Sequence, residues 1–150
     1  MNFDFKPFNS LSLDEFHDLI ALRIKVFVIE QNCPYQDLDG KDKNSVHVIG
    51  RDSNNTIVAT ARILPAGISY PEVAIGRVVV AKDLRGTGAG HQLMKAIIDF
   101  IRQDFGAVPI RISAQKHLEK YYNSHLFVST GKAYLEDGIP HIEMLYQPIN

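Results

Sequence analysis

The stretch VVVAKDLRGTGAGHQLMKAII, residues 78–98, decides the fold because a glycine-rich turn joins two apolar runs of different periodicity. The first run is β-branched, as in a strand, and the second repeats every three to four residues, as in a helix. Gly86, Gly88 and Gly90 let the backbone approach a ligand or adopt a positive φ. A strand, such a turn and a helix N-terminus bring free amides and the positive end of the helix dipole together, which favours a bound phosphate.

Two common phosphate-binding motifs do not fit this turn. A dinucleotide motif needs G-x-G-x-x-G after the first strand of a repeated βαβ series, and a P-loop needs Gly-Lys-Ser/Thr, whereas these glycines stand at alternate positions. In an anion site Thr87 would add a hydroxyl and Arg85 a charge. The glycine spacing alone also allows a plain turn, so the neighbouring elements must decide.

The residues before the turn predict one strand, one helix and three further strands. The alternating residues 2–8 predict an antiparallel or edge strand, and a capping box of Ser12 with Glu15 predicts a helix from Leu13. Residues 31–44 are predicted to be an exposed loop, long enough to bind a ligand. Residues 45–51 and 56–64 flank the turn-forming DSNN and predict a hairpin, and residues 72–81 predict a longer strand.

After the turn the pattern predicts a helix that Gly106 ends, then a short strand, a short helix and a closing hairpin. The hairpin turns at Asp137 and Gly138, a two-residue turn signal. This order predicts a mixed α/β or α+β sheet with helices on its faces, and we expect residues 1–150 to form a single domain.

Composition excludes several classes of protein. With 16 Lys and Arg against 17 Asp and Glu the net charge is −1, which gives no basic field for nucleic acid, so any anion must be held by local geometry. The chain has no apolar run of membrane-spanning length, a single cysteine, Cys33, no Cys/His metal spacing and no signal core. We expect a cytoplasmic protein with no metal and no membrane partner.

Arg85, Gly88 and Gly90 satisfy the pattern Q/R-x-x-G-x-G/A, and here the chain resembles the GNAT superfamily of N-acetyltransferases over nearly its whole length. Residues 23–42 and 136–144 are similar to its ElaA-type branch. The resemblance implies a GNAT-like acyl-CoA N-acyltransferase fold, a central, mostly antiparallel sheet with splayed fourth and fifth strands. It implies acetyl-CoA as co-substrate, with the pyrophosphate on the amides of Arg85, Gly86, Thr87, Gly88, Ala89, Gly90 and His91.

The resemblance also implies where the acyl group lies. The pantetheine arm would run beside Val78, Val79 and Val80, and an amide near Val78 would stabilise the developing oxyanion. Tyr122 falls where the family keeps a general-acid tyrosine, whereas Tyr121 would face the core. Leu126 stands where the family pattern has glycine, and this departure bears on the aim of Tyr122.

The base that frees the amine is less defined, because Glu30, His47, Glu72 and His141 all compete for that role. Glu30 and His47 rank first, since they flank the 31–44 loop beside the expected acceptor groove. Three aspartates of that loop either attract a cationic amine or are simply solvated: Asp37, Asp39 and Asp42.

Three other residues keep two interpretations each. Arg62 and Arg77 either bind an acceptor carboxylate or pair with a neighbouring strand. Cys33 could carry an acyl group, but a packed or turn-lining thiol is favoured because nothing near it in sequence would activate it.

The leading hypothesis is an acetyl-CoA-dependent N-acetyltransferase that acts on a primary amine of a small molecule or peptide by direct attack in a ternary complex. Two alternatives stay open: a non-catalytic acetyl-CoA-binding sensor or scaffold, and an acyltransferase similar to acyl-homoserine-lactone synthases. The final strands also allow a homodimer.

Overall fold

A seven-stranded sheet carries the fold, in the order β1-β2-β3-β4-β5-β7-β6. The computed structural model describes residues 1–149. Its strands are β1 (Asn2–Pro7), β2 (Val46–Arg51), β3 (Ile57–Leu64), β4 (Val73–Val80), β5 (Ile110–Gln115), β6 (Phe127–Glu136) and β7 (Ile139–Tyr146). All neighbouring strands are antiparallel except β4 and β5, which run parallel. The predicted mixed, mostly antiparallel sheet is confirmed.

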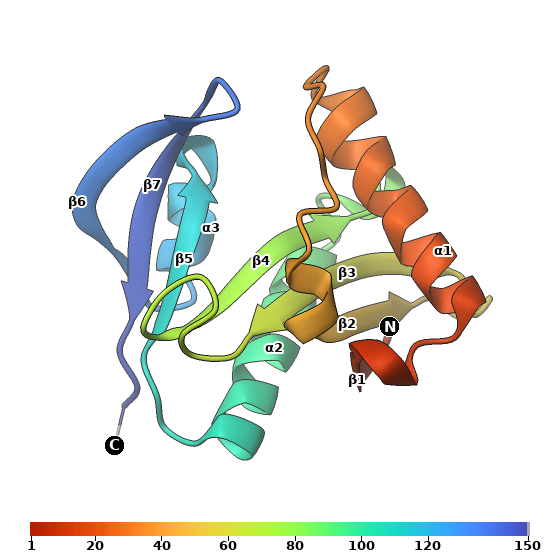
Figure 1. The fold of residues 1–150 in the computed structure, drawn as a ribbon, viewed down its shortest axis with the longest axis horizontal. Helices are drawn as coiled ribbons and strands as arrows, with labels where there is room; N and C mark the ends of the chain where they lie inside the picture. Colours follow the sequence, from red (N-terminus) through yellow and green to blue (C-terminus); the bar gives the residue numbers. More distant parts are fainter. Residues whose placement is uncertain (150) are drawn as a thin grey trace.

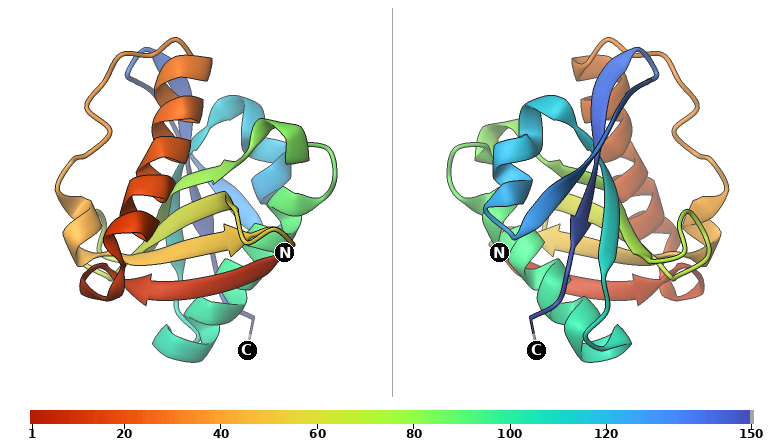
Figure 2. Two further views of the ribbon diagram at one scale, coloured as in Figure 1. Left: turned by 90° about the vertical axis from the view of Figure 1, so that its right-hand side faces the viewer. Right: turned by 90° about the vertical axis from the view of Figure 1, so that its left-hand side faces the viewer.

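Helices cover both faces of this sheet, α1 (Leu13–Arg23) on one face and α2 (Ala89–Phe105) and α3 (Glu119–Asn123) on the other (Figures 1 and 2). The capping box predicted at Ser12 and Glu15 begins α1. In α2 the side chains at helical spacing are fully buried, among them Leu93, Met94 and Ile97, and Gly106, at φ +88°, ends the helix. No helix in residues 1–149 is both long and apolar enough to cross a membrane.

The sheet is split between β4 and β5. The two strands pair only at Val73 with Ile110 and at Ala74 with Arg111. Beyond these pairs the half made of β1–β4 and the half made of β5–β7 diverge, as Figure 1 shows. Just past the last pair, β4 carries a register shift against β3 with Arg77 at φ +52°, a bulge that turns the strand. The splayed fourth and fifth strands are therefore present.

The first helix ends in an element that the apolar spacing did not predict. Residues Ile24–Glu30 form a π-helix, η2, that continues α1. π-Helical segments are rare in proteins, and many of those that occur lie at functional sites. Phe27, expected on the apolar stripe of the helix, lies in this element and lines the cleft between the two halves of the sheet.

Candidate active site

A large cavity lies at the glycine-rich turn, with a volume of about 870 Å³. Its walls come from the end of β4, the start of α2, η2 and α3. The residues predicted to hold the donor that line it are Val78, Val79, Val80, Arg85, Gly86, Gly88, Gly90 and His91. We call it the donor cavity.

The turn presents a set of backbone amides with no partner. Within residues 1–149 no hydrogen bond engages the amides of Gly86, Gly88, Ala89, Gly90 and His91. The first intrahelical bond runs from the amide of Gln92 to the carbonyl of Gly88, and no side chain caps the helix. An anion bound here would satisfy these donors and meet the positive end of the α2 dipole.

The glycines serve two purposes. Gly86 and Gly88 lie at φ +80° and +87°, a conformation that L side chains rarely adopt. Gly90 has no such φ, and a Cβ there would only touch the Tyr121 ring at 3.6 Å. Conformation therefore explains Gly86 and Gly88 but not Gly90.

Arg85 and Thr87 are already engaged in the turn. The guanidinium of Arg85 holds both oxygens of Glu30, with Nη2 to Oε2 at 2.7 Å, and these bonds lower the pKa of Glu30. The Thr87 hydroxyl donates to the carbonyl of Leu84. Both side chains thus have partners within the protein, whereas the amides named above do not. Glu30, predicted as a base, lies in the donor cavity as the partner of Arg85.

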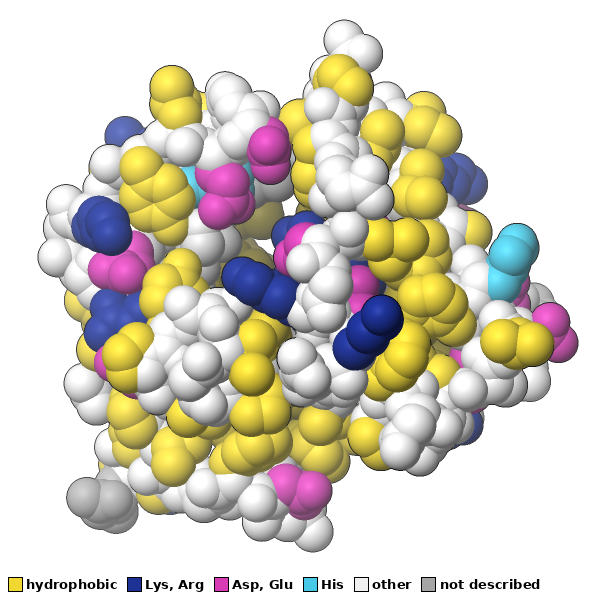
Figure 3. All heavy atoms as spheres, viewed as in Figure 1, with side chains coloured by type: hydrophobic (Ala, Val, Ile, Leu, Met, Phe, Trp, Pro, Cys, Tyr) yellow, Lys and Arg dark blue, Asp and Glu magenta, His cyan; other side chains and the backbone are white. Residues whose placement is uncertain are grey.

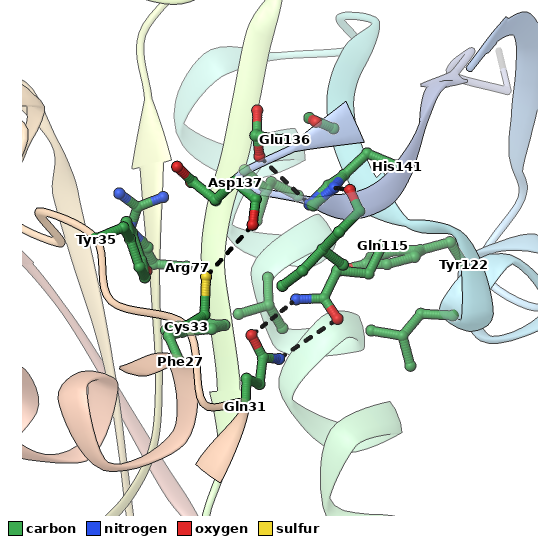
Figure 4. Close-up of a pocket in the computed structure, with 16 residues that line it drawn as sticks. Phe27, Gln31, Cys33, Tyr35, Arg77, Gln115, Tyr122, Glu136, Asp137 and His141 are labelled. Carbon is green, nitrogen blue, oxygen red and sulfur yellow. Dashed lines mark hydrogen bonds and ion pairs between the residues drawn. The ribbon is translucent and has the colours of Figure 1, made fainter. Parts of the chain in front are cut away.

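A second, smaller cavity of about 110 Å³ adjoins the first. It lies between the β6–β7 hairpin, the segment after η2 and the bulge of β4, and Figure 3 shows the surface hollowed there. We call it the acceptor cavity. The two cavities share the residues Phe27, Gln31, Val78, Gln115, Leu118, Tyr122 and Ile139. At this junction the amides of Gln31 and Gln115 reach across the split sheet, with both N to O distances at 3.4 Å (Figure 4).

The two adjacent tyrosines differ in their hydroxyl groups. Tyr121 donates to the carbonyl of Gly90 at 2.6 Å and packs against the core. Tyr122 lies at the junction of the cavities, and its hydroxyl has no hydrogen-bond partner in the part of the chain that the structure describes. Burial raises the pKa of both phenols, so Tyr122 stays protonated at neutral pH.

Leu126 keeps the turn that the family pattern forms with glycine. Its φ is +71°, and its amide donates to the carbonyl of Asn123. The departure from the pattern therefore leaves a left-handed residue at the end of α3, at a cost in backbone strain.

The three aspartates of the 31–44 loop are all engaged in ion pairs. Their partners are three arginines: Arg23 binds Asp37 and Asp42, Arg62 binds Asp39 and Asp42, and Arg77 binds Asp37 and Asp39. Asp37 and Asp42 are buried. The expectation of an exposed loop is thus wrong for Asp37 and Asp42, whereas Asp39 is exposed although it binds two arginines. Three positive and three negative charges cancel in this network, which fixes the loop to α1, β3 and β4.

His47 lies in the same network and away from both cavities. It is 1% exposed, its Nε2 is 2.8 Å from the carbonyl oxygen of Asp42, and burial lowers its pKa. His47 lines neither the donor nor the acceptor cavity. The structure thus places the two highest-ranked base candidates outside the acceptor cavity, because Glu30 lines only the donor cavity.

Of the remaining candidates, Glu72 is held in an ion pair, whereas Cys33 and His141 line the acceptor cavity. Glu72 forms a two-point ion pair with Arg111, at 2.9 and 2.8 Å. Cys33 is buried beside the acceptor cavity, with its Sγ 3.5 Å from the carbonyl of Asp137. His141 lines the acceptor cavity and contacts Glu136.

Sequence reasoning missed Arg23, the Gln31–Gln115 pair and Glu136. Arg23 stands four residues after the fully buried Leu19 on the inner face of α1, so an arginine on an apolar stripe was the available signal. Glu136 could have been found from the two-residue turn, whose register places it on the same face of the hairpin as His141. No local signal links Gln31 with Gln115, because they are 84 residues apart.

Comparisons with known proteins agree with this geometry. The family model described as "Acetyltransferase (GNAT) domain" matches residues 16–147. Protein ElaA of Escherichia coli is 41% identical over 143 residues, 94% of this chain and 93% of the relative. A UPF0039 protein of Synechocystis is 39% identical over 147 residues, which are 98% of this chain and 96% of that protein.

Solved structures are similar over the same length. The crystal structure of an acyl-CoA N-acyltransferase from Pseudomonas aeruginosa has a TM-score of 0.89 at 36% identity, and that of E. coli ElaA has 0.90 at 38%. Each comparison covers 97% of this chain and 99% of the other.

Proposed function

Because the chain belongs to the GNAT family of acetyltransferases, whose members take acyl-CoA co-substrates and amine acceptors, we propose that it transfers an acetyl group from acetyl-CoA to a primary amine of a small molecule or peptide. The transfer is a direct attack in a ternary complex. The observation that carries the proposal is the set of unpartnered amides at Gly86 and residues 88–91, which line a cavity that meets a second one at Tyr122.

The turn and α2 hold the donor in this proposal. The free amides of Gly86 and of residues 88–91 bind the pyrophosphate. Arg85 and Glu30 neutralise each other beside it, so binding depends on directed N–H groups and less on net charge. Acetyl-CoA supplies a reactive acyl thioester to the junction of the two cavities.

Two groups of the chain serve the transfer at that junction. From Ile75 onward β4 has no pairing with β5, so its edge is free beside the cavities. The Val78 amide donates to the acyl oxygen as negative charge develops on it, and such a donor is worth roughly 3 kcal/mol in other enzymes. The Tyr122 hydroxyl, protonated and without a partner, gives its proton to the departing thiolate.

The test is calorimetric titration with acetyl-CoA, desulfo-coenzyme A, NAD and ATP. We expect the two coenzyme A compounds alone to bind tightly. Gly88→Asp and Gly88→Asn form a matched pair, because both side chains tolerate the positive φ of Gly88 but only the aspartate brings negative charge to the phosphate site.

We expect Gly88→Asp to weaken acetyl-CoA binding more than about tenfold beyond Gly88→Asn, since like-charge repulsion at the amides costs more than bulk alone. Equal affinities of the two variants, or a wild type that does not bind acetyl-CoA, would refute the donor site. Circular dichroism of each variant checks that it folds.

A further inference from the structure

The acceptor cavity holds a histidine whose tautomer is fixed by the backbone. The His141 side chain is 8% exposed, and its Nδ1 is 2.7 Å from the carbonyl oxygen of Ile139. A carbonyl oxygen only accepts, so Nδ1 carries a proton and donates it there. In the neutral ring the lone pair is then on Nε2.

The Nε2 atom has no hydrogen bond within residues 1–149. Its polar neighbour is Oε2 of Glu136 at 3.3 Å, shown by a dashed line in Figure 4. The Tyr122 hydroxyl lines the same cavity and is equally without a partner in the described residues, although Tyr122 is only 7% exposed. Two polar side chains that are more than nine-tenths buried thus line one cavity, and neither Tyr122 Oη nor His141 Nε2 is among the fully buried polar atoms without a partner in the described residues. Tyr122 Oη is therefore free to bond a ligand that enters the cavity, and Nε2 has only the Glu136 carboxylate beside it.

The charges around the cavity favour a cation. Glu136 and Asp137 line it from the hairpin, and Arg77 lines it from the bulge of β4. Arg77 is already committed, with Nε to Oδ1 of Asp37 at 2.9 Å and Nη2 to the Asp37 carbonyl at 3.1 Å. A carboxylate on the acceptor would therefore meet two acidic side chains and a neutralised arginine.

We propose that this end of the acceptor cavity binds an aliphatic primary amine as its ammonium ion, held by Glu136, and that His141 Nε2 takes its proton. The inference rests on the proposed function and specifies its acceptor: a slender amine without a carboxylate, because a cavity of about 110 Å³ admits only a narrow chain. Glu136 then stabilises the imidazolium that His141 becomes.

The reaction balances with these groups. The ammonium loses one proton to His141 Nε2, the neutral nitrogen bonds to the acyl carbon, and the carbon–sulfur bond breaks. The thiolate takes the Tyr122 proton, and the second proton that leaves the nitrogen restores Tyr122. His141 returns its proton to water past Glu136, which is half exposed.

The test uses two probes of equal chain length, 1,4-diaminobutane and 4-aminobutanoate, with free coenzyme A as the product measured and direct binding followed by calorimetry. We expect at least a tenfold preference in kcat/KM for the diamine. Glu136→Gln should raise KM for the diamine and remove most of the preference, with little change in the affinity for acetyl-CoA.

His141→Asn removes Nε2 but can keep the bond to the Ile139 carbonyl. We expect kcat/KM to fall about 100-fold at pH 7 and to recover toward pH 10, where the amine loses its proton to water unaided. The titratable and charged groups around the ring are Glu136 and Tyr134 of β6, Glu143 of β7, Asp137 of the turn and Arg77 of β4. His17→Asn, at an exposed histidine of α1, is the matched control and should change nothing.

The outcomes separate the two proposals. If acetyl-CoA does not bind, the proposed function fails. If acetyl-CoA binds but the diamine neither binds nor reacts, if 4-aminobutanoate is preferred, or if His141→Asn keeps full activity at pH 7, the ammonium site is wrong and the donor site stands.

Discussion

Tyr122 is the proposed proton donor, and its hydroxyl has no hydrogen-bond partner within residues 1–149. Tyr122 lines the junction of the two cavities, whereas the Tyr121 hydroxyl donates a hydrogen bond to the Gly90 carbonyl. Tyr122→Phe should lower kcat by about 100-fold and leave the affinity for acetyl-CoA unchanged, because only the proton donor is lost. Tyr121→Phe is the matched control, expected to cost stability and little turnover. If the chain were a non-catalytic binding protein, neither the wild type nor these two variants would show turnover.

Leu126 offers a test of strain at one residue. Leu126 has φ +71° and is 54% exposed. Burial of its side chain therefore contributes little to stability, whereas the left-handed backbone conformation destabilises the fold. Leu126→Gly should raise the free energy of unfolding by about 0.5–1 kcal/mol in urea. Leu135→Gly, at an exposed position inside β6, should lower it, because glycine weakens a strand interior. A destabilised Leu126→Gly would contradict the strain argument.

At the scale of residues, a sequence predicts types and spacings better than partners. The turn glycines and the capping pair follow from local rules and lie where those rules place them. The partner of Arg85 does not follow from local rules, because Glu30 is 55 residues away in the sequence and contacts Arg85 only in the folded chain.

Among the elements, the loop between η2 and β2 is held by three arginines, of which Arg23 of α1 is the most buried. Arg23 binds Asp37 and Asp42 while its side chain is only 2% exposed. Arg23→Met keeps the bulk of the side chain but leaves two buried carboxylates short of a partner, which should cost about 3–5 kcal/mol of unfolding free energy. Urea unfolding measures this loss.

The matched control is Lys95→Met on α2, where the ion pair with Asp99 is exposed and should be worth less than about 0.5 kcal/mol. Equal losses in Arg23→Met and Lys95→Met would show that the loop is held by something other than the buried ion pairs.

Elements were predictable in kind and order because periodicity and turn residues act locally. The π-winding of η2 and the bulge at Arg77 were not, since neither alters the apolar pattern by which helices and strands are recognised. Both irregular elements border the cavities, so the site departs from the regular pattern that predicts the rest of the fold.

For the whole molecule, stability should fall in acid. Hydrogen bonds from Lys6 and Ser12, with Arg51, lower the pKa of Glu15 to about 2. The pKa values of Asp39 and Asp42 are also lowered by their arginine partners, despite their burial. Folded values below the unfolded ones of about 4 mean that this stabilisation is complete above pH 4 to 5 and is lost as the pH falls toward 2. The neutral, buried His47 acts in the same direction below about pH 6.5.

Urea midpoints measured from pH 7 to pH 2 check this expectation. Glu15→Gln should be less stable at pH 7 and should show a shallower decline in acid, because its carboxylate no longer takes up a proton on unfolding. An unchanged slope would mean that Glu15 does not contribute to the acid transition.

The split between β4 and β5 gives each of the two cavities its own entrance from the surface. The donor cavity is walled by α2 and α3 and the acceptor cavity by the 31–44 loop and the hairpin, and they share only the junction residues. Because each cavity has its own entrance, we expect the proposed donor and acceptor to bind in either order. Free coenzyme A would then compete with acetyl-CoA, and the acetylated amine with the acceptor amine. Such product inhibition is that of a random-order mechanism.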